Sequence, residues 1–412
     1  MITTLADARA LDNADPLYAI RDQFELPSDV IYLDGNSLGP LSTPAREAVE
    51  RIVSHQWGPD LIKSWNQHDW IHMPLRVGDQ IGRLIGAAPR QTLCCDSISV
   101  NLFKVLCASL DQFPGHVILS TKDNFPTDLY MVQGIQKLLA ERNIELKLVA
   151  ESELLDAIDS SVCAVLVTQV NFRTGALLNV SALVEKAHSA HAALILDLAH
   201  SAGAVPVELD TWRVDFAVGC TYKYLNAGPG APAFLYVAQQ HLGKAVQPLW
   251  GWMGHANPFA FSPQYEPAKD ISQFLTGTPS ILAMAAVEGA LKVFEGINLA
   301  TVREKSLQLS QAFELELERR GLLDYMPSIS PTNVECRGSQ LSFAHEHAYA
   351  ICQAWIAAGV IADFRAPNYL RVGFTPLYLS FEELRTAIDK LEHIMTAEIY
   401  LQSQFQQRQK VT

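Results

Sequence analysis

Residues 194–232 read LILDLAHSAGAVPVELDTWRVDFAVGCTYKYLNAGPGAP, and this stretch decides the fold. It holds two apolar runs, each with the length and composition of a buried strand. Asp197 ends the first run and His200 follows three residues later, while Lys223 follows the second run, ahead of a Gly-Pro-rich loop. In a parallel sheet, ligands bind at the carboxyl ends of the strands. We therefore expect Asp197 and Lys223 to converge on one ligand.

The sequence on either side repeats this alternation of apolar runs and helical patterns. We predict strands in HVILS (116–120), SVCAVLVTQV (161–170) and APAFLYVA (231–238), and helices over 127–143 and 180–192. Strands that alternate with helices are typical of a mostly parallel sheet with helices on both faces. The sequence thus predicts an α/β fold.

The pattern changes after Pro279, where long helices give way to a mixture of short strands and helices. We predict a large domain over 41–280, a smaller α+β domain over 281–412, and an N-terminal segment, 1–40, that packs with the small domain or over the site. Residues 247–278 form a long aromatic stretch rich in Pro and Gly. Structureless loops of that length are usually functional or lie at an interface.

Composition limits the classes of function. The chain has 412 residues, 49% of them hydrophobic and 18% charged, with a net charge of −13. An acidic chain without a dense Lys/Arg block argues against nucleic acid or an anionic membrane as the main partner. The start resembles no signal peptide and no apolar run is long enough to span a bilayer, so we expect a cytoplasmic protein. Seven cysteines without CxxC spacing predict buried free thiols, and no HExxH is present, so we expect no metal.

A lysine and an aspartate at successive strand ends suit pyridoxal 5′-phosphate (PLP). The lysine would form the Schiff base, and the aspartate would hold the pyridinium nitrogen protonated. The segment SISVNLFKVL (97–106) opens a helix whose free N–H groups suit a phosphate, although Ser97 or Ser99 also serves as an ordinary N-cap. Phe125 is able to stack on a flat ring or simply to pack, and His200 to contact the cofactor or support Asp197.

The order and the residues of these motifs resemble those of the kynureninase family of fold-type-I PLP enzymes. The resemblance spans nearly the whole chain and is most specific in YLDGNSLGP (32–40) and in DFAVGCTYKYLNAGPGAPAF (215–234). Further matching segments are FPTD (125–128), DLAHSAGAVPVELD (197–210), GWMGH (251–255), GTPSI (277–281) and LRVGFTPLY (370–378).

The resemblance implies a role for each matching residue. Lys223 would carry the cofactor, with Tyr222 as a candidate general acid or base, and Arg371 would bind the substrate α-carboxylate. The residues implied to hold the cofactor are Ile98, Ser99, Phe125, Pro126, Thr127, Asp128, Thr168, Asp197, His200, Tyr222, Lys223, Trp252 and Thr278. Trp252 and Thr278 would reach it from the partner subunit of a homodimer. Some relatives have asparagine at the position of Thr278, which leaves the preference between kynurenine and its 3-hydroxy form open.

The implied reaction is hydrolysis of L-kynurenine to anthranilate and L-alanine, in tryptophan catabolism and pyridine nucleotide biosynthesis. An aminotransferase or cysteine desulfurase of the same fold would share the Asp and Lys. A desulfurase, however, would have histidine before the lysine and a mobile reactive cysteine, whereas Tyr222 precedes Lys223 and Cys336 is the one loosely suitable thiol. A binding protein that had lost activity would lack Lys223 or Asp197, and both are present.

Overall fold

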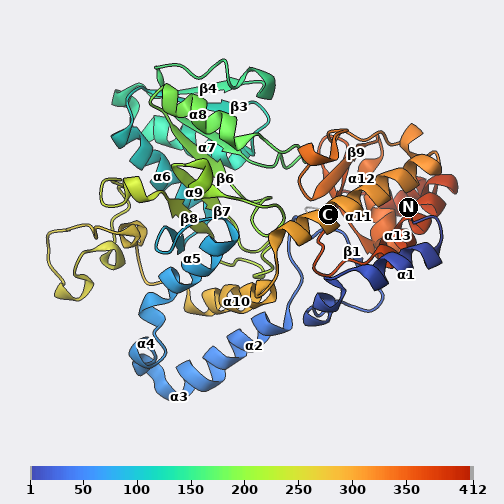
Figure 1. Ribbon diagram of the computed structural model, residues 1–412, viewed down its shortest axis with the longest axis horizontal. Helices are drawn as coiled ribbons and strands as arrows, with labels where there is room; N and C mark the ends of the chain where they lie inside the picture. The colour runs from blue at the N-terminus through green and yellow to red at the C-terminus, as the bar shows by residue number, and fades with distance from the viewer. Residues whose placement is uncertain (1, 409–412) are drawn as a thin grey trace.

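A seven-stranded sheet forms the centre of the computed structural model, which describes residues 2–408 (Figure 1). Its strand order is β2-β8-β7-β6-β5-β3-β4, in which β3 to β7 run parallel and β8 is antiparallel to both of its neighbours. The strands are β2 (Thr92–Cys94), β3 (Val117–Thr121), β4 (Glu145–Val149), β5 (Val162–Thr168), β6 (Ala193–Asp197), β7 (Phe216–Gly219) and β8 (Phe234–Val237). The predicted α/β class with a mostly parallel sheet is confirmed.

Both faces of the sheet are buried, and alternate residues of one strand belong to different cores. In β6, Leu194 and Leu196 join one hydrophobic cluster, whereas Ala193 and Ile195 join the other. Successive side chains of a strand point to opposite faces, so a strand covered on both sides must be apolar throughout. The covering helices are α5 (Met73–Leu84), α6 (Ile98–Gln112), α7 (Pro126–Leu138), α8 (Val180–Ser189) and the short α9 (Leu209–Trp212).

The edge strand β4 has no counterpart among the strands predicted from sequence. Its five residues read ELKLV, none of them is fully buried, and Glu145 and Lys147 alternate with leucines. An edge strand needs only one apolar face, so its pattern lacks the continuous apolar run that marked β5 and β6.

The C-terminal region, described to residue 408, contains a three-stranded antiparallel sheet in the order β11-β12-β9, formed by β9 (Gln340–Ala344), β11 (Asp363–Arg365) and β12 (Tyr369–Gly373). A further short strand, β10 (Val360–Ile361), lies outside this sheet. The helices of the region are α10 (Ile281–Leu291), α11 (Leu299–Arg319), α12 (Ala348–Ala357), α13 (Phe381–Thr396) and α14 (Ser403–Gln406). Helix α10 packs against α2 (Thr43–Arg51) and α5, beneath the large sheet (Figure 1).

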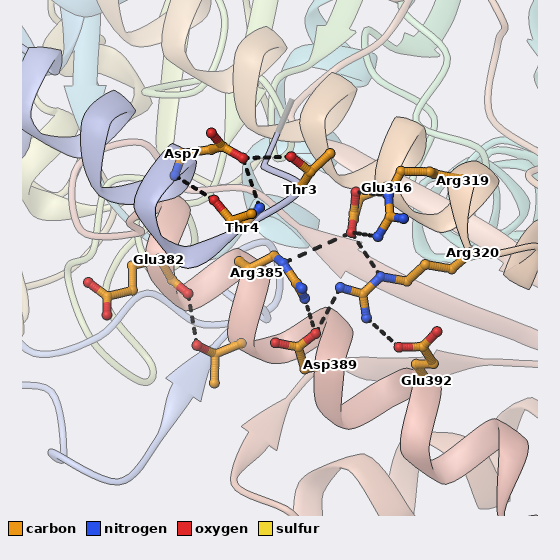
Figure 2. A network of polar contacts seen from close by, with 11 residues as sticks. Thr3, Thr4, Asp7, Glu316, Arg319, Arg320, Glu382, Arg385, Asp389 and Glu392 are labelled. Atoms are coloured by element: carbon orange, nitrogen blue, oxygen red, sulfur yellow. Dashed lines mark hydrogen bonds and ion pairs between the residues drawn. The ribbon is translucent and has the colours of Figure 1, made fainter.

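The N-terminal segment lies against this C-terminal region. Helix α1 (Leu5–Ala14) packs on α13, and β1 (Ile31–Tyr32) pairs in parallel with β10. Nearby, Arg320 at the end of α11 contacts Glu316 of the same helix and Asp389 and Glu392 of α13 (Figure 2). These ion pairs join α11 to α13.

Residues 247–278 extend from the sheet as the long yellow loop of Figure 1. Three single-turn helices are its regular structure, η8 (Trp252–Gly254), η9 (Pro258–Ala260) and η10 (Ile271–Phe274). Below this loop in Figure 1, α2, α3 (Gly58–Asp60) and α4 (Ser64–Gln67) form a projecting arm, which we call the α2–α4 arm. No helix within residues 2–408 is long and apolar enough to cross a membrane. Cys336 is exposed and the other cysteines are buried free thiols, namely Cys94, Cys95, Cys107, Cys163, Cys220 and Cys352.

Candidate active site

The carboxyl ends of β5, β6 and β7 bring together the residues predicted from the sequence. Thr168 is the last residue of β5 and Asp197 the last of β6, and the two are paired in register. Lys223 follows the end of β7 by four residues. Because parallel strands end at the same edge of a sheet, the three side chains meet there, as expected for a ligand site in this class of fold.

Lys223 contacts His200 directly, with 3.0 Å between Nζ and Nε2. His200 is buried, and burial lowers its pKa well below the ordinary value of 6.5, an effect that the charge of Lys223 reinforces. A neutral imidazole leaves Nε2 free to accept an N–H from the lysine. Its Nδ1 atom is buried and has no hydrogen-bond partner among the residues that the structure describes.

Asp197 and Asp128 are two buried carboxyls at this edge. Burial raises the pKa of both, and the charge of Lys223 opposes the shift at Asp197. The negative charge of Asp197 raises the pKa of Asp128 further, so Asp128 is the more easily protonated of the two. Asn124 donates to Asp128 Oδ2 over 3.3 Å, while Asp128 Oδ1 is buried without a partner in the described chain.

The first turn of α7 carries Phe125, Pro126, Thr127 and Asp128, the FPTD motif. Phe125 precedes the helix with Pro126 at its first position, and Asp128 points into the buried edge of the sheet. Lys223 Nζ lies 6.0 Å from the centre of the Phe125 ring. The ring is 38% exposed and meets Phe172 edge-on at 5.3 Å, so a face remains open toward the lysine.

Helix α6 begins beside the same edge. Ser97 is its N-cap, accepting a hydrogen bond of 3.4 Å from the Val100 N–H, so Ser99 does not serve as the cap. Ile98 and Ser99 are the first two helical residues and are half-buried. The N–H groups of a first turn have no partner inside the helix, which makes this turn a suitable anion site.

Arg371 lies in the middle of β12 and is 1% exposed. Its Nε and Nη2 bond the two oxygens of Asp363 at 2.9 and 2.6 Å. Nη2 also donates to Ser37 Oγ at 3.0 Å, and Nη1 donates to the Phe172 carbonyl at 2.7 Å. Since Phe172 packs on Phe125, these contacts connect Arg371 to the lysine end of the site.

Sequence reasoning assigned no role to Asp363, Ser37 or Phe172. Asp363 sits in ADFRAPNYLRVG, only eight residues before Arg371, and pairs with it across the β11–β12 register. Ser37 belongs to YLDGNSLGP, a motif noted for its specificity. An acid facing an arginine across two short strands was therefore a usable signal.

Tyr222 directly precedes Lys223 and interacts with the charge of Asp197, whereas Trp252 and Thr278 lie in the loop 247–278. Tyr222 is half-buried, and burial raises the pKa of its phenol above the ordinary value of 10.0. Trp252 is half-buried in η8 against Phe259, and Thr278 is exposed. Within residues 2–408, neither Trp252 nor Thr278 forms a hydrogen bond with the cluster around Lys223.

The residues at this edge fit PLP. The amine of Lys223 can form a Schiff base with the aldehyde of PLP, and the Asp197 carboxylate can pair with the protonated ring nitrogen. Phe125 offers a face for a flat ring, and the first turn of α6 offers N–H groups for a phosphate. The unpartnered atoms of His200 and Asp128 support the fit, because buried polar atoms are almost always bonded and these two lack a partner within the described chain.

Comparison with known proteins gives both sequence relatives and structural neighbours. Residues 302–391 match the family model described as the kynureninase C-terminal domain. A kynureninase of Burkholderia mallei (strain SAVP1) is 44% identical over 99% of this chain and 100% of its own length. A kynureninase of Pseudomonas fluorescens is 43% identical over the full length of both chains.

The solved structures that are similar share the fold at low sequence identity. A cysteine desulfurase from Thermococcus onnurineus NA1 gives a TM-score of 0.79 at 19% identity, covering 92% of this chain and 98% of its own. A variant of C-DES with glycine covalently linked to its PLP cofactor gives 0.77 at 18% identity, covering 90% and 98%. At such identities the likeness concerns the fold alone, whereas the relatives above match over the whole sequence.

Proposed function

The chain belongs to the kynureninase family, and from that premise we propose which of its residues carry out each part of the reaction. The enzyme is a PLP-dependent hydrolase that cleaves a carbon–carbon bond of L-kynurenine to give anthranilate and L-alanine. The predicted family, reaction and cofactor are thereby confirmed. The roles of individual residues below are our proposals.

One observation supports the assignment of the site most strongly, namely the contact of Lys223 with a neutral His200 beside the buried acid Asp197. The test is to incubate the purified protein with L-kynurenine and no keto acid. We expect anthranilate and alanine in equal amounts. Kynurenic acid that forms only with a keto acid, or faster release of sulfide from cysteine, would instead indicate an aminotransferase or a desulfurase.

We propose that Lys223 binds the cofactor and moves the proton at the substrate Cα. PLP, when bound, supplies an electron sink conjugated to that carbon. The partner of the lysine is neutral His200, which accepts an N–H without competing for the proton, because its pKa is held well below the ordinary value by burial. The amine of Lys223 can therefore act as the base that removes the Cα proton and as the acid that gives a proton back.

Asp197 is proposed to face the cofactor ring nitrogen, with Asp128 as its neutral neighbour. The Ala199 N–H donates to Asp197 Oδ1 over 2.7 Å, which helps to keep the charge on this carboxyl. A protonated ring nitrogen beside Asp197 would also favour the ionised form of this carboxyl.

Tyr222 is proposed as a proton donor rather than a base. Burial raises its pKa above 10.0, so the phenol stays protonated at neutral pH. A protonated phenol is suited to donate to the oxygen of the γ-carbonyl or to the leaving carbon. The raised pKa gives it no advantage as a general base.

Arg371 is proposed to bind the substrate α-carboxylate. A buried guanidinium recognises a carboxylate through two parallel hydrogen bonds, which a lysine cannot reproduce. In this structure Asp363 already takes one edge of the guanidinium, so the substrate must use the edge now held by Ser37 and the Phe172 carbonyl.

We further propose a homodimer whose second chain supplies Trp252 and Thr278. Large apolar side chains are exposed on the loop 247–278 and on the α2–α4 arm, among them Phe261 at 79% and Ile62 at 78%. An apolar cleft of about 750 Å³ lies between residues 25–50, the Gly-Pro-rich loop at 226–231 and α10. Exposed apolar surface of this extent marks an interaction site, and a second copy would both cover it and bring the loop to the site.

We also propose that the enzyme works in the cytoplasm. Buried free thiols are typical of proteins kept in a reducing compartment. Fractionation of cells that produce the protein tests the location directly, and recovery of the activity outside the cytoplasmic fraction would contradict it.

A further inference from the structure

The motif YLDGNSLGP is used only in part by the reaction above, yet its loop lies against Arg371. The Leu33 N–H donates to the Ile361 carbonyl at 2.7 Å, and the Gly373 N–H donates to the Leu33 carbonyl at 2.7 Å, which fixes the loop to β10 and β12. A Cβ at Gly35 would overlap Thr375 and Tyr378. This close approach places Asp34 and Ser37 at the guanidinium end of the site.

Two carboxyls and two guanidiniums meet there. Asp363 bonds Arg371 through both oxygens and also pairs with Arg365 at 2.7 Å. Ser37 Oγ donates to Asp363 at 2.9 Å and accepts from both arginines. Asp34 is the second carboxyl, and the charges of Asp363, Arg371 and Arg365 act on it. Its Oδ1 is buried without a partner among the described residues.

When both carboxyls are ionised, the charges of this cluster balance without a substrate and do not balance with one. Two guanidiniums offset two ionised carboxylates. A substrate carboxylate beside Arg371 would be the third negative charge against two positive ones, in a site where Arg371 and Asp363 are each 1% exposed. Unbalanced charge in a poorly solvated site is costly, and the usual remedy is that one group changes its protonation state.

We propose that Asp34 takes up a proton from solvent when a substrate carboxylate binds at Arg371, so that substrate recognition is linked to proton uptake. The proposal rests on the proposed role of Arg371 and extends it. Asp34 is the carboxyl that takes the proton because Asp363 is held in a bidentate pair, whereas Asp34 keeps a free oxygen.

The pKa of Asp34 supports this choice. Burial, followed by the charge of Asp363, raises the pKa to about 7, against the opposing effects of Ser37, Arg371 and Arg365. The carboxyl is thus largely protonated below pH 7 and ionised above it in the free enzyme. A third carboxylate would raise this pKa further. Proton uptake should then be small below pH 7 and grow above it, and affinity should fall as pH rises through about 7.

The remaining ionisable groups around Asp34 keep one protonation state in this range. Burial raises the pKa of three tyrosines and one thiol that interact with it, and lowers that of the imidazole at the lysine end of the site. These groups are Tyr32, Tyr224, Tyr378, Cys352 and His200. The charged groups that face it are Asp363, Arg365 and Arg371.

The experiment measures proton uptake by titration calorimetry of the PLP-loaded enzyme. The probe is 4-oxo-4-phenylbutanoate, which has the carboxylate and γ-carbonyl of the substrate and no amine to titrate. Binding is measured in two buffers of different ionisation heat, at about pH 6 and about pH 8. We expect roughly half to one proton taken up at about pH 8 and much less at about pH 6. The matching carboxamide should bind without this uptake.

Three variants separate the explanations. Asp34→Asn should abolish the uptake and remove the loss of affinity above pH 7, whereas Asp29→Asn, an exposed acid of the same segment, should change neither. Uptake that persists in Asp34→Asn overturns the proposal. If Arg371→Lys leaves the affinity of the probe unchanged, the carboxylate site itself is misassigned. Should Asp34→Asn not fold, equal uptake by the wild type with the carboxylate and the carboxamide would overturn the proposal equally.

Discussion

The site around Lys223 and the ion cluster around Arg320 hold their buried polar groups in opposite ways. Arg320 is 4% exposed and its three nitrogens contact Glu316, Glu392 and Asp389 at 2.9, 2.6 and 2.8 Å (Figure 2). At the site, by contrast, the buried atoms His200 Nδ1 and Asp128 Oδ1 have no partner within residues 2–408. The guanidinium of Arg320 is thus satisfied by the chain itself, whereas these two atoms of the site have no partner in the described chain.

This difference gives a criterion for separating structure from function. A satisfied group adds to the stability of the folded chain and can bind a ligand only by exchanging a partner, as we propose for Arg371, whose partners Ser37 and the Phe172 carbonyl would give way. Unsatisfied buried groups cost stability and are retained where a bound molecule satisfies them. Substitutions at the site should therefore alter kinetics more than stability, and those in the Arg320 cluster should do the reverse.

The largest expected effect is that of Lys223→Ala. We expect turnover to fall by roughly 10⁴-fold or more, because no other group can attach the cofactor. The absorbance of bound cofactor should be lost, while the cofactor-free protein should still fold, since Lys223 forms one side-chain hydrogen bond within residues 2–408, to His200. Borohydride reduction and peptide mapping provide the check. Labelling of a different lysine would refute the assignment.

Arg371→Lys should have the next largest effect. Loss of a bidentate, charge-assisted contact should cost about 3 kcal/mol in transition-state binding, or roughly a hundredfold in kcat/KM. Arg365→Lys is the matched control, because Arg365 contacts the same Asp363 and is half-exposed. Steady-state kinetics of both variants decide the matter. Equal losses would show that the carboxylate is not recognised by Arg371 in particular.

Arg320→Met tests the satisfied cluster. We expect a loss of about 2 kcal/mol in the free energy of unfolding, less than for a fully buried pair because Asp389 and Glu392 are half-exposed and can be rehydrated. Denaturant unfolding measures the loss, and kcat/KM should stay within twofold of the wild type, roughly. Arg9→Met, which breaks the exposed pair with Glu382, should leave unfolding unchanged. A fall in kcat/KM without a fall in the free energy of unfolding would contradict the proposed structural role of the Arg320 cluster.

The smallest expected effect concerns the homodimer, and it tests whether Trp252 of one subunit contributes to the active site around Lys223 of the other. Trp252→Ala and Lys223→Ala proteins, each nearly inactive, are mixed and allowed to exchange subunits. Hybrid dimers combine both lesions in one site and leave the other intact, so activity should return to roughly a quarter of the wild-type level. Two copies of the same variant, mixed in the same way, are the control. No recovery after verified exchange, or a fully active monomer, would rule out the shared site.

Much of the site was predictable because buried parallel strands have a recognisable apolar pattern in the sequence. A strand buried on both faces must be apolar throughout, so β5, β6 and β7 stand out, and the polar residues that end β5 and β6, Thr168 and Asp197, point to the ligand edge. The edge strand β4 lacks that constraint and escaped prediction. Arg371 was predicted from the resemblance of LRVGFTPLY to the kynureninase family, and the bidentate fit of an arginine for a carboxylate is consistent with that role.

The fold class and the family could be predicted from the sequence, because both depend on local apolar patterns and short motifs, and the same patterns led us to propose the Asp197–Lys223 pair. What these residues contact became known from the folded chain. Ser37 and Asp363 are 326 residues apart along the chain and 2.9 Å apart in space, and this contact joins an N-terminal loop to the arginine of β12. Hydrogen bonds and pKa shifts depend on neighbours and burial, which packing sets. The proton that we assign to Asp34 follows from such packing and from no motif.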